Sequence, residues 1–469
     1  MVFSSVVFMF VFLPLVLSCY FLIKKEIRNF FLLIVSLVFY AWGEPRAIVI
    51  MLASILLNYI CGLLIDYIRK YESKLLNRMC LCITVVGNLS LLFYFKYFDF
   101  FITIINEIFN KHIALRNIAL PIGISFFTFQ GMSYVLDLYL GNVKVQKNLM
   151  KLALYVSLFP QLIAGPIVRY KDVNDQIDHR ESNLENITEG IRRFSIGLAK
   201  KAIIANELGL VADSIFSVAP MNNSMSITWL GAICYSFQIY FDFSGYSDMA
   251  IGIGKILGFT FLENFNYPYI SKSLTEFWRR WHISLSSWFR DYLYIPLGGN
   301  RRGNVYFNLF LVFFATGLWH GAAWNFIIWG LWHGIFLIIE RVFKVKGIKL
   351  NVAAPIKWVY TCLIVIIGWV MFRAVNMSEA LTYIGVMLGL IKTNSLGLNI
   401  GWYLNNKVAT VLVIAVIASI PWKEVLGKYI HMTELKREIL YNCYCIIILI
   451  IAMGNVMTST YNPFIYFRF

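Results

Sequence analysis

The chain consists of apolar runs separated by short polar stretches. The runs cover residues 6–23, 30–41, 48–65, 79–95, 118–140, 149–163, 227–241, 306–318, 322–339, 358–372, 380–391, 408–420 and 439–453. A transmembrane helix needs about 20 residues, so several of these runs are shorter than a full span. Short runs interrupted by Gly or Pro are typical of re-entrant or broken helices buried in protein. The pattern predicts an all-α polytopic membrane protein with a single domain over residues 1–469.

Composition agrees with a membrane location. Hydrophobic residues make up 59% of the chain and charged residues 14%, with a mean hydropathy of +0.69. A soluble globular chain is nearer 45–50% apolar and about 25% charged. The first apolar run has no basic segment before it and no small-residue cleavage site after it, so we expect it to remain as the first span.

Basic side chains lie in short clusters between the apolar runs. The clusters are Lys24, Lys25 and Arg28; Arg69, Lys70, Lys74 and Arg78; and Lys423, Lys428, Lys436 and Arg437. The positive-inside rule and anionic lipid place such clusters in cytoplasmic loops. The net charge of +16 therefore indicates a lipid bilayer as partner and no nucleic acid. Alternation from the first cluster predicts an N-terminus outside the cell.

The pentapeptide Gly-Leu-Trp-His-Gly occurs at 317–321 and again at 330–334, and the pair Trp281–His282 lies upstream. An imidazole exchanges a proton near neutral pH, so these histidines are candidate bases in a site with little water. The alternative for each one is a hydrogen-bonded core residue. On an unbroken helix His320 and His333 would point about 140° apart, so they serve one cavity only if the backbone breaks near Gly321.

A second polar stretch surrounds the first Trp–His pair. Ser273 and Glu276 have the spacing of a capping box, in which Glu276 would accept from the Ser273 amide. The helix that follows carries basic and aromatic residues all round, which favours an interfacial or re-entrant helix. Helical periodicity places Trp278, His282, Leu285 and Phe289 on one face of it.

Two carboxylates, Asp242 and Asp248, adjoin apolar sequence. An aspartate at the bilayer centre costs roughly 2.5–3.5 kcal/mol, so each is expected to be paired, neutral or in a wet cavity. A functional role and a structural role as a partner of arginine are both open. The eight cysteines show no ligand spacing with the histidines, so no metal site is expected and most are read as small buried hydrophobes.

Residues 121–130, 242–248, 276–294 and 317–334 closely resemble the membrane-bound O-acyltransferase (MBOAT) family, in the bacterial branch that O-acetylates alginate and peptidoglycan. The resemblance covers essentially the whole chain and implies a ring of about 11–12 transmembrane and re-entrant helices around a central funnel. It implies that His320 is the catalytic histidine and that His282 is a second polar group in the funnel. The residues expected to line this funnel are Trp278, Trp281, Trp288, Arg290, Asp291, Asn325, Trp319, His333 and Asp242.

The resemblance also implies an activity: transfer of an acyl group, expected to be acetyl, from a cytoplasmic thioester such as acetyl-CoA, with no bound cofactor. The group would cross the plasma membrane of a bacterium toward a surface or secreted polysaccharide, through a periplasmic or extracellular acetyltransferase partner. The aromatic tail, about 461–469, has a central Tyr466 that would carry the group as a phenolic ester, because phenol is a weak nucleophile but a good leaving group. Alone, the tail reads equally well as an interfacial anchor.

Two other functions remain possible at this point. One is D-alanyl transfer to teichoic acid, which also occurs in the family, although its typical members are shorter and rely on a separate partner for the aromatic tail. The other is a transporter or flippase without a covalent step, because broken helices and intramembrane charge also suit that class.

Overall fold

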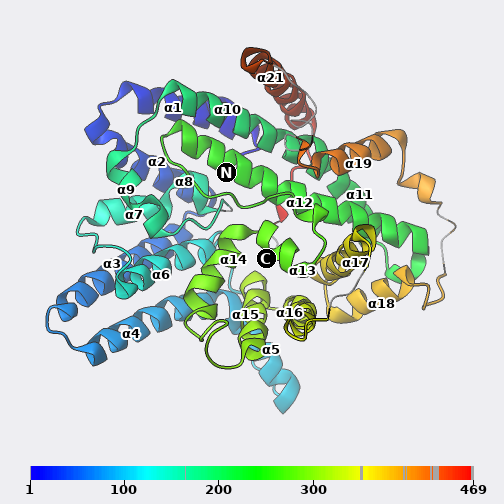
Figure 1. The fold of residues 1–469 in the computed structure, drawn as a ribbon, viewed down its shortest axis with the longest axis horizontal. Coiled ribbons are helices and arrows are strands. Elements are labelled where there is room, and N and C mark those ends of the chain that lie inside the picture. Colours follow the sequence, from blue (N-terminus) through cyan, green and yellow to red (C-terminus); the bar gives the residue numbers. More distant parts are fainter. Residues whose placement is uncertain are drawn as a thin grey trace. The chain divides into compact units, whose positions relative to one another are not determined.

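The computed structural model describes residues 2–163, 165–348, 352–394, 397, 399–422, 425 and 433–465 (Figure 1). Regular structure within these ranges is helical, without a strand. The chain forms two compact units, Met1–Phe194 with Met249–Leu262 and Ser195–Asp248 with Glu263–Phe469. Each unit is therefore built from separate stretches of the sequence.

Six helices in the described ranges are long and apolar enough to cross a membrane. They are Lys25–Gly43, Ala47–Arg69, Lys74–Phe109, Trp324–Val345, Ala354–Arg373 and Glu434–Thr458. Three shorter apolar helices cover Phe8–Leu22, Val305–His320 and Asn406–Ala418. These helices confirm the predicted all-α polytopic membrane protein, while the ring, the funnel and the single domain stay predictions.

The first unit contains most of the N-terminal helices. They are η1 (Phe8–Phe12), α1 (Leu13–Leu22), η2 (Lys25–Ile27), α2 (Arg28–Gly43), α3 (Ala47–Arg69), α4 (Lys74–Leu92), η3 (Phe93–Tyr97), α5 (Phe98–Phe109), α6 (Ile124–Leu140), α7 (Leu149–Ser157), α8 (Phe159–Leu162), α9 (Tyr170–His179) and most of α10 (Leu184–Ala199). The apolar run 118–140 begins earlier than α6 because Gly123, with φ +77°, turns the chain first. The run 149–163 breaks at Leu158, two residues before Pro160, whose ring cannot continue a helix.

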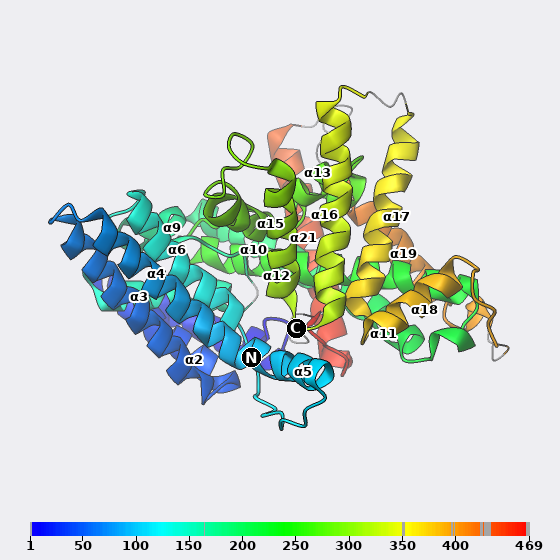
Figure 2. The ribbon, with the colours of Figure 1, turned by 90° about the horizontal axis from the view of Figure 1, so that it is seen from below.

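The second unit holds the remaining helices. They are η4 (Lys200–Ala205), α11 (Asn206–Phe216), η5 (Pro220–Asn222), most of α12 (Met225–Ile256), η6 (Pro268–Ile270), α13 (Leu274–Arg280), α14 (Ile283–Phe289), η7 (Arg290–Tyr294), α15 (Val305–His320), α16 (Trp324–Val345), α17 (Ala354–Arg373), α18 (Met377–Met387), η8 (Ile400–Trp402), α19 (Asn406–Ala418) and α21 (Glu434–Thr458). Figure 2 shows α15, α16 and α17 side by side, with α16 between the other two.

The two Gly-Leu-Trp-His-Gly repeats lie on α15 and α16, which form a tight antiparallel hairpin. The first glycines of the repeats face each other. A Cβ on Gly330 would overlap the Phe313 carbonyl oxygen and lie 3.0 Å from the Gly317 Cα, and one on Gly317 would lie 2.5 Å from the Phe326 oxygen. Small residues let membrane helices approach this closely. These glycines therefore set the distance between the two helices that carry His320 and His333.

Two predictions about the region 273–289 were wrong in detail. The expected single helix is two short ones, because His282 has left-handed backbone geometry (φ +44°) between α13 and α14. The Ser273 hydroxyl does accept from the Glu276 amide at 3.0 Å, but the Glu276 carboxylate accepts from the Lys272 amide at 2.9 Å instead of that of Ser273. The capping box is therefore displaced by one residue on its carboxylate side.

Candidate active site

Three buried histidines of the second unit form the candidate site. His320 is the last residue of α15, His333 lies in the third turn of α16, and His282 joins α13 to α14. The α15 helix ends at His320, and Gly321 is extended, which is the backbone break that a shared site requires. All three imidazoles are at most 5% exposed. The three Trp–His pairs thus lie in one unit, with their imidazoles buried.

Two tryptophans link the three imidazoles in series. The Trp319 ring lies 5.9 Å from the His282 ring and 4.9 Å from the His320 ring, between centroids. The Trp329 ring lies 5.0 Å from His320 and 5.3 Å from His333. The histidines therefore share aromatic walls. The ring planes in these contacts meet at 68–87°, the edge-to-face arrangement that aromatic pairs favour.

His320 lies in an aromatic enclosure completed by Phe372 of α17, whose ring centroid is 5.2 Å away. Phe372 also lines a cavity of about 200 Å³. The lining residues are Tyr235, Ala323, Asn325, Phe326, Phe372, Arg373, Ala374, Val375 and Ile465. The Phe372 ring thus lies between the cavity, which it lines, and the His320 imidazole.

Asn325, predicted to line the funnel, lies in this cavity wall but also has a structural bond. Its side-chain amide donates to the Ala374 carbonyl oxygen at 2.9 Å, just past the end of α17. Its amide oxygen is buried and has no hydrogen-bond partner within the described ranges. A buried acceptor of this kind is available to a hydroxyl or amide donor of a bound molecule.

His333 is more completely enclosed than the other two. The Trp278 ring lies 5.1 Å from it, and a Cβ on Gly368 of α17 would lie 2.6 Å from its Nε2 atom. Both of its ring nitrogens are buried without a hydrogen-bond partner among the residues that the structure describes. Its packing fits a wall of the site more closely than a group that reaches substrate.

His282 is oriented by Asn264, which the sequence did not identify. The Asn264 side-chain oxygen accepts from the Ser284 amide at 3.2 Å, which fixes the amide orientation, and lies 3.1 Å from His282 Nδ1. Nδ1 therefore carries the proton and Nε2 is the basic nitrogen. His282 lies outside the candidate spans, and burial lowers the pKa of its imidazole to about 3, so the ring is neutral.

The remaining tryptophans of the prediction have different surroundings. Trp281 packs in the core against Phe277, Phe265 and Trp369, with centroid distances of 5.6, 5.0 and 4.8 Å. Trp288 packs against Tyr292 at 5.1 Å. Trp281 therefore supports the wall behind the histidines.

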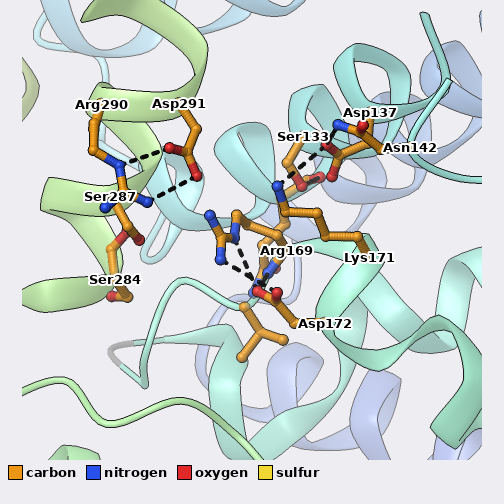
Figure 3. A network of polar contacts seen from close by, with 12 residues as sticks. Ser133, Asp137, Asn142, Arg169, Lys171, Asp172, Ser284, Ser287, Arg290 and Asp291 are labelled. Atoms are coloured by element: carbon orange, nitrogen blue, oxygen red, sulfur yellow. Dashed lines mark hydrogen bonds and ion pairs between the residues drawn. The ribbon is translucent and has the colours of Figure 1, made fainter. Parts of the chain in front are cut away.

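Arg290 and Asp291, also predicted in the funnel, form an ion pair at the start of η7 (Figure 3). Arg290 Nε lies 2.7 Å from one Asp291 oxygen, and Nη2 lies 3.2 Å from the other. The Arg290 side chain is 61% exposed and that of Asp291 19%. The role of this pair in the funnel stays a prediction.

The first unit has charged side chains in contact around α9 (Figure 3). Arg169 pairs with Asp172 at 2.9 Å, and Asp137 lies 3.7 Å from Lys171 and accepts from Asn142 at 3.0 Å. Arg169 and Asp172 together cap the start of α9. These contacts have a structural role within that unit.

Asp242 and Asp248 are both paired, as the cost of intramembrane charge required, but their partners are lysines. Asp242 lies 2.6 Å from Lys201 Nζ, and Asp248 lies 2.7 Å from Lys200 Nζ. The two lysines are consecutive in the π-helix η4, and Lys201 and Asp242 are each at most 3% exposed in their side chains.

The C-terminal tail is described as far as Ile465, and Tyr466 lies outside the described residues. Phe464 and Ile465 are both buried, and Ile465 lines the cavity. Sequence reasoning left the role of the tail undecided. It missed three other residues around the site, which are Lys201, Arg373 and Asn264. A Lys–Lys pair in an apolar segment and an Arg at the end of a span were the available signals.

Together these features define a polytopic membrane protein with buried imidazoles beside a cavity that is lined by apolar side chains and a few polar ones. The model of the membrane-bound O-acyltransferase family matches residues 142–374. The probable alginate O-acetylase AlgI of Pseudomonas aeruginosa is 49% identical over 81% of this chain and 73% of that protein. The peptidoglycan O-acetyltransferase of Helicobacter pylori is 39% identical over 83% and 80%. The teichoic acid D-alanyltransferase of Bacillus subtilis is 31% identical over 65% and 78%.

The chain belongs to the membrane-bound O-acyltransferase family, and it is a multi-pass membrane O-acyltransferase. Membership in this family decides against a transporter without a covalent step.

Proposed function

We propose that the protein moves an acetyl group from a cytoplasmic thioester such as acetyl-CoA to a hydroxyl acceptor on the outer side of the plasma membrane. A separate extracytoplasmic acetyltransferase then passes the group to a polysaccharide. Similarity to enzymes that O-acetylate alginate and peptidoglycan supports acetyl as the group and a glycan as the destination.

The orientation follows from the charges at the helix ends. Arg301 and Arg302 precede α15, and Lys344 and Lys346 lie at the end of α16, so the positive-inside rule places these ends in the cytoplasm. The link between α15 and α16, which begins at His320, then lies toward the outer face. Lys436 and Arg437 in the first turn of α21 likewise place its far end, and the tail after it, outside. The outer N-terminus is proposed separately, from the basic clusters at 24–28 and 69–78.

In the proposed reaction His320 is the general base. Its imidazole takes the proton of the acceptor hydroxyl while the oxygen attacks the thioester carbonyl carbon. The new C–O ester bond forms, the C–S bond breaks, and the leaving thiolate receives the proton from the imidazolium. Such a base contributes typically about 10²–10⁴-fold, and exclusion of water and alignment supply more.

The observation that carries this proposal is the placement of His320, which ends α15 inside an aromatic enclosure one ring away from the cavity. His282, neutral and fixed by Asn264, is proposed to orient the acceptor. Its left-handed backbone is a strained conformation of a kind that clusters at functional sites. Tyr466 is proposed as the first acceptor, through its phenolic oxygen.

The test is acetyl transfer by the purified protein in proteoliposomes given labelled acetyl-CoA. His320→Ala is expected to lower the rate about 100-fold or more without loss of folded protein. His112→Ala is the matched control, because His112 is exposed on the loop after α5 and should keep the parent rate. A normal rate for His320→Ala would refute the catalytic assignment.

D-alanyl transfer to teichoic acid is the second candidate, and the similarity to the Bacillus subtilis D-alanyltransferase supports it. The mass of the peptide that contains Tyr466 distinguishes the two, because acetyl and alanyl adducts differ. An alanyl adduct in cells would replace the acetyl assignment. An unmodified Tyr466 under turnover would remove its carrier role.

A further inference from the structure

The described end of the C-terminal tail, Tyr461–Ile465, is held by two acidic groups of the second unit, one half-buried and one buried. The first is Asp213 of α11. Its Oδ2 atom accepts from the Tyr461 hydroxyl at 2.7 Å, while its Oδ1 atom pairs with Arg373 Nη2 at 2.7 Å. Arg373 is also a cavity-lining residue. One carboxylate thus joins the tail to the cavity wall.

The second acidic group is Asp242 of α12. Its Oδ2 atom accepts from the Ile465 backbone amide at 2.8 Å, and its Oδ1 atom lies 2.6 Å from Lys201 Nζ. The same Lys201 ammonium donates to the Pro463 carbonyl oxygen. Both members of this ion pair therefore bind the main chain of the tail, on either side of Phe464.

These contacts fix the tail through its backbone as well as its side chains. Between the two backbone bonds the Phe464 ring packs on Tyr246 of α12, with centroids 4.7 Å apart. Ile465 then lines the cavity whose Phe372 packs on His320. An interfacial anchor would require none of these buried charges, since its affinity comes from aromatic contact with lipid headgroups.

We propose that Lys201, Asp242 and Asp213 are positioning residues that dock the C-terminal tail at the cavity, so that the tail serves as a tethered acyl acceptor. This proposal rests on the proposed acyl transfer to the tail. Tethering replaces a bimolecular encounter by an intramolecular one, with an effective concentration in the millimolar range for a short flexible link. The buried ion pair therefore serves the reaction as well as the core.

The alternative is an ion pair that only stabilises the fold, with a tail that happens to cover it. The two cases differ in one property. A loss of docking can be compensated by free tail peptide, whereas a loss of fold cannot.

The first test removes a single docking atom. Ile465→Pro deletes the amide that donates to Asp242 and leaves the Lys201–Asp242 pair in place. Ile465→Ala is the matched control, because it removes the side chain and keeps the amide. We expect acetyl transfer in proteoliposomes to fall about 10–100-fold further for Ile465→Pro than for Ile465→Ala, the range of one charge-assisted hydrogen bond.

The second test adds a synthetic peptide of residues 462–469 at about 1 mM, the effective concentration of a tether. The peptide should restore acetyl transfer to Ile465→Pro and become acetylated itself, and should leave His320→Ala inactive. Folding is controlled by size-exclusion behaviour and melting temperature. Equal rates for Ile465→Pro and Ile465→Ala, or a folded Ile465→Pro protein that no peptide restores, would overturn the positioning role.

A double variant, Lys201→Met with Asp242→Asn, removes both charges together and avoids a single uncompensated buried charge. Hydrogen exchange of the peptide covering 459–469 should rise in this variant, and its transfer rate should fall and recover with added peptide. Increased exchange with a parent rate of transfer would refute the positioning role alone. Loss of activity in His320→Ala is unaffected by that result, so failure of this proposal and failure of the acyl-transfer proposal remain distinguishable.

Discussion

The close approach of α15 and α16 at Gly330 leads to a strong prediction. A methyl group at this position would overlap the Phe313 carbonyl oxygen and lie 3.0 Å from Gly317 Cα and 3.1 Å from Gly317 N. All three atoms are backbone, so no side-chain rotation relieves the contact. Gly330→Ala therefore requires the two helices to move apart.

Two energies of opposite sign decide the outcome. Alanine favours the helix over glycine by about 1 kcal/mol. Overpacking typically costs about 1–3 kcal/mol, and a contact between two backbones belongs at the upper end. We expect a net loss of about 1–2 kcal/mol in stability. The same shift displaces His320, which lies three residues beyond Gly317, and a misplacement near 1 Å can reduce the rate about 10²-fold.

The assay compares melting temperature in detergent with acetyl transfer in proteoliposomes. Gly454→Ala in α21 is the matched control, because nothing lies within 4 Å of the added methyl group. It should raise the melting temperature slightly and keep the rate, whereas Gly330→Ala should lower both. A Gly330→Ala protein that behaves like Gly454→Ala would refute the proposed helix contact.

Two further predictions concern Asn264, which contacts His282, and the exposed Arg290 at the start of η7. Asn264→Ala should lower the rate about 10-fold and the stability by about 1–3 kcal/mol, because it leaves His282 Nδ1 and Ser284 without their acceptor. Asn264→Asp keeps an acceptor and should recover most of the rate. A parent rate for Asn264→Ala would mean that His282 has a packing role only. Arg290→Ala should change the stability by less than about 1 kcal/mol, since the Arg290 side chain is 61% exposed. A tenfold rise in KM for acetyl-CoA in this variant would instead place Arg290 in the donor path.

The sequence was most informative where local chemistry decides the structure. Apolar runs predicted most of the long helices because a span must bury about 20 residues of hydrocarbon-compatible side chains. The end of α15 before Gly321 meets the condition that the sequence set for a shared site, since His320 and His333 on one unbroken helix would point about 140° apart. The cost of Asp242 in an apolar segment required a pair, a neutral carboxyl or a wet cavity, and the structure shows a pair.

The break at His282 could not be predicted from periodicity. The residues from Trp278 to Phe289 keep a helical pattern and contain neither Gly nor Pro. In the structure, the backbone of a preceding segment takes over the helical hydrogen bonds: the Asn266 amide donates to the Arg280 oxygen, and the Ile283 amide to the Asn264 oxygen, both at 2.9 Å. Such tertiary competition depends on where another segment packs, and single-helix propensity contains no information on that.

The sequence also could not predict which residue pairs with each buried charge, because this too depends on how distant segments pack. Lys201 and Asp242 are 41 residues apart, and their pairing with Pro463 and Ile465 joins segments more than 200 residues apart. Composition correctly requires a partner for each buried charge, but only the packed structure selects which one.

The glycines of the repeated pentapeptide show how packing and chemistry are combined in one motif. The sequence drew attention to the histidines, whereas the structure gives Gly317 and Gly330 the task of setting the helix separation. Because each glycine lies three residues before its histidine, the same contact that holds the hairpin together also fixes both imidazoles against Trp329. The whole pentapeptide is therefore repeated because the two antiparallel helices cross at this point. Each helix must contribute a small residue and an aromatic surface to the crossing. A repeat that served proton chemistry alone would need its histidines but no glycine at the crossing, and the Gly330→Ala measurement separates these two explanations.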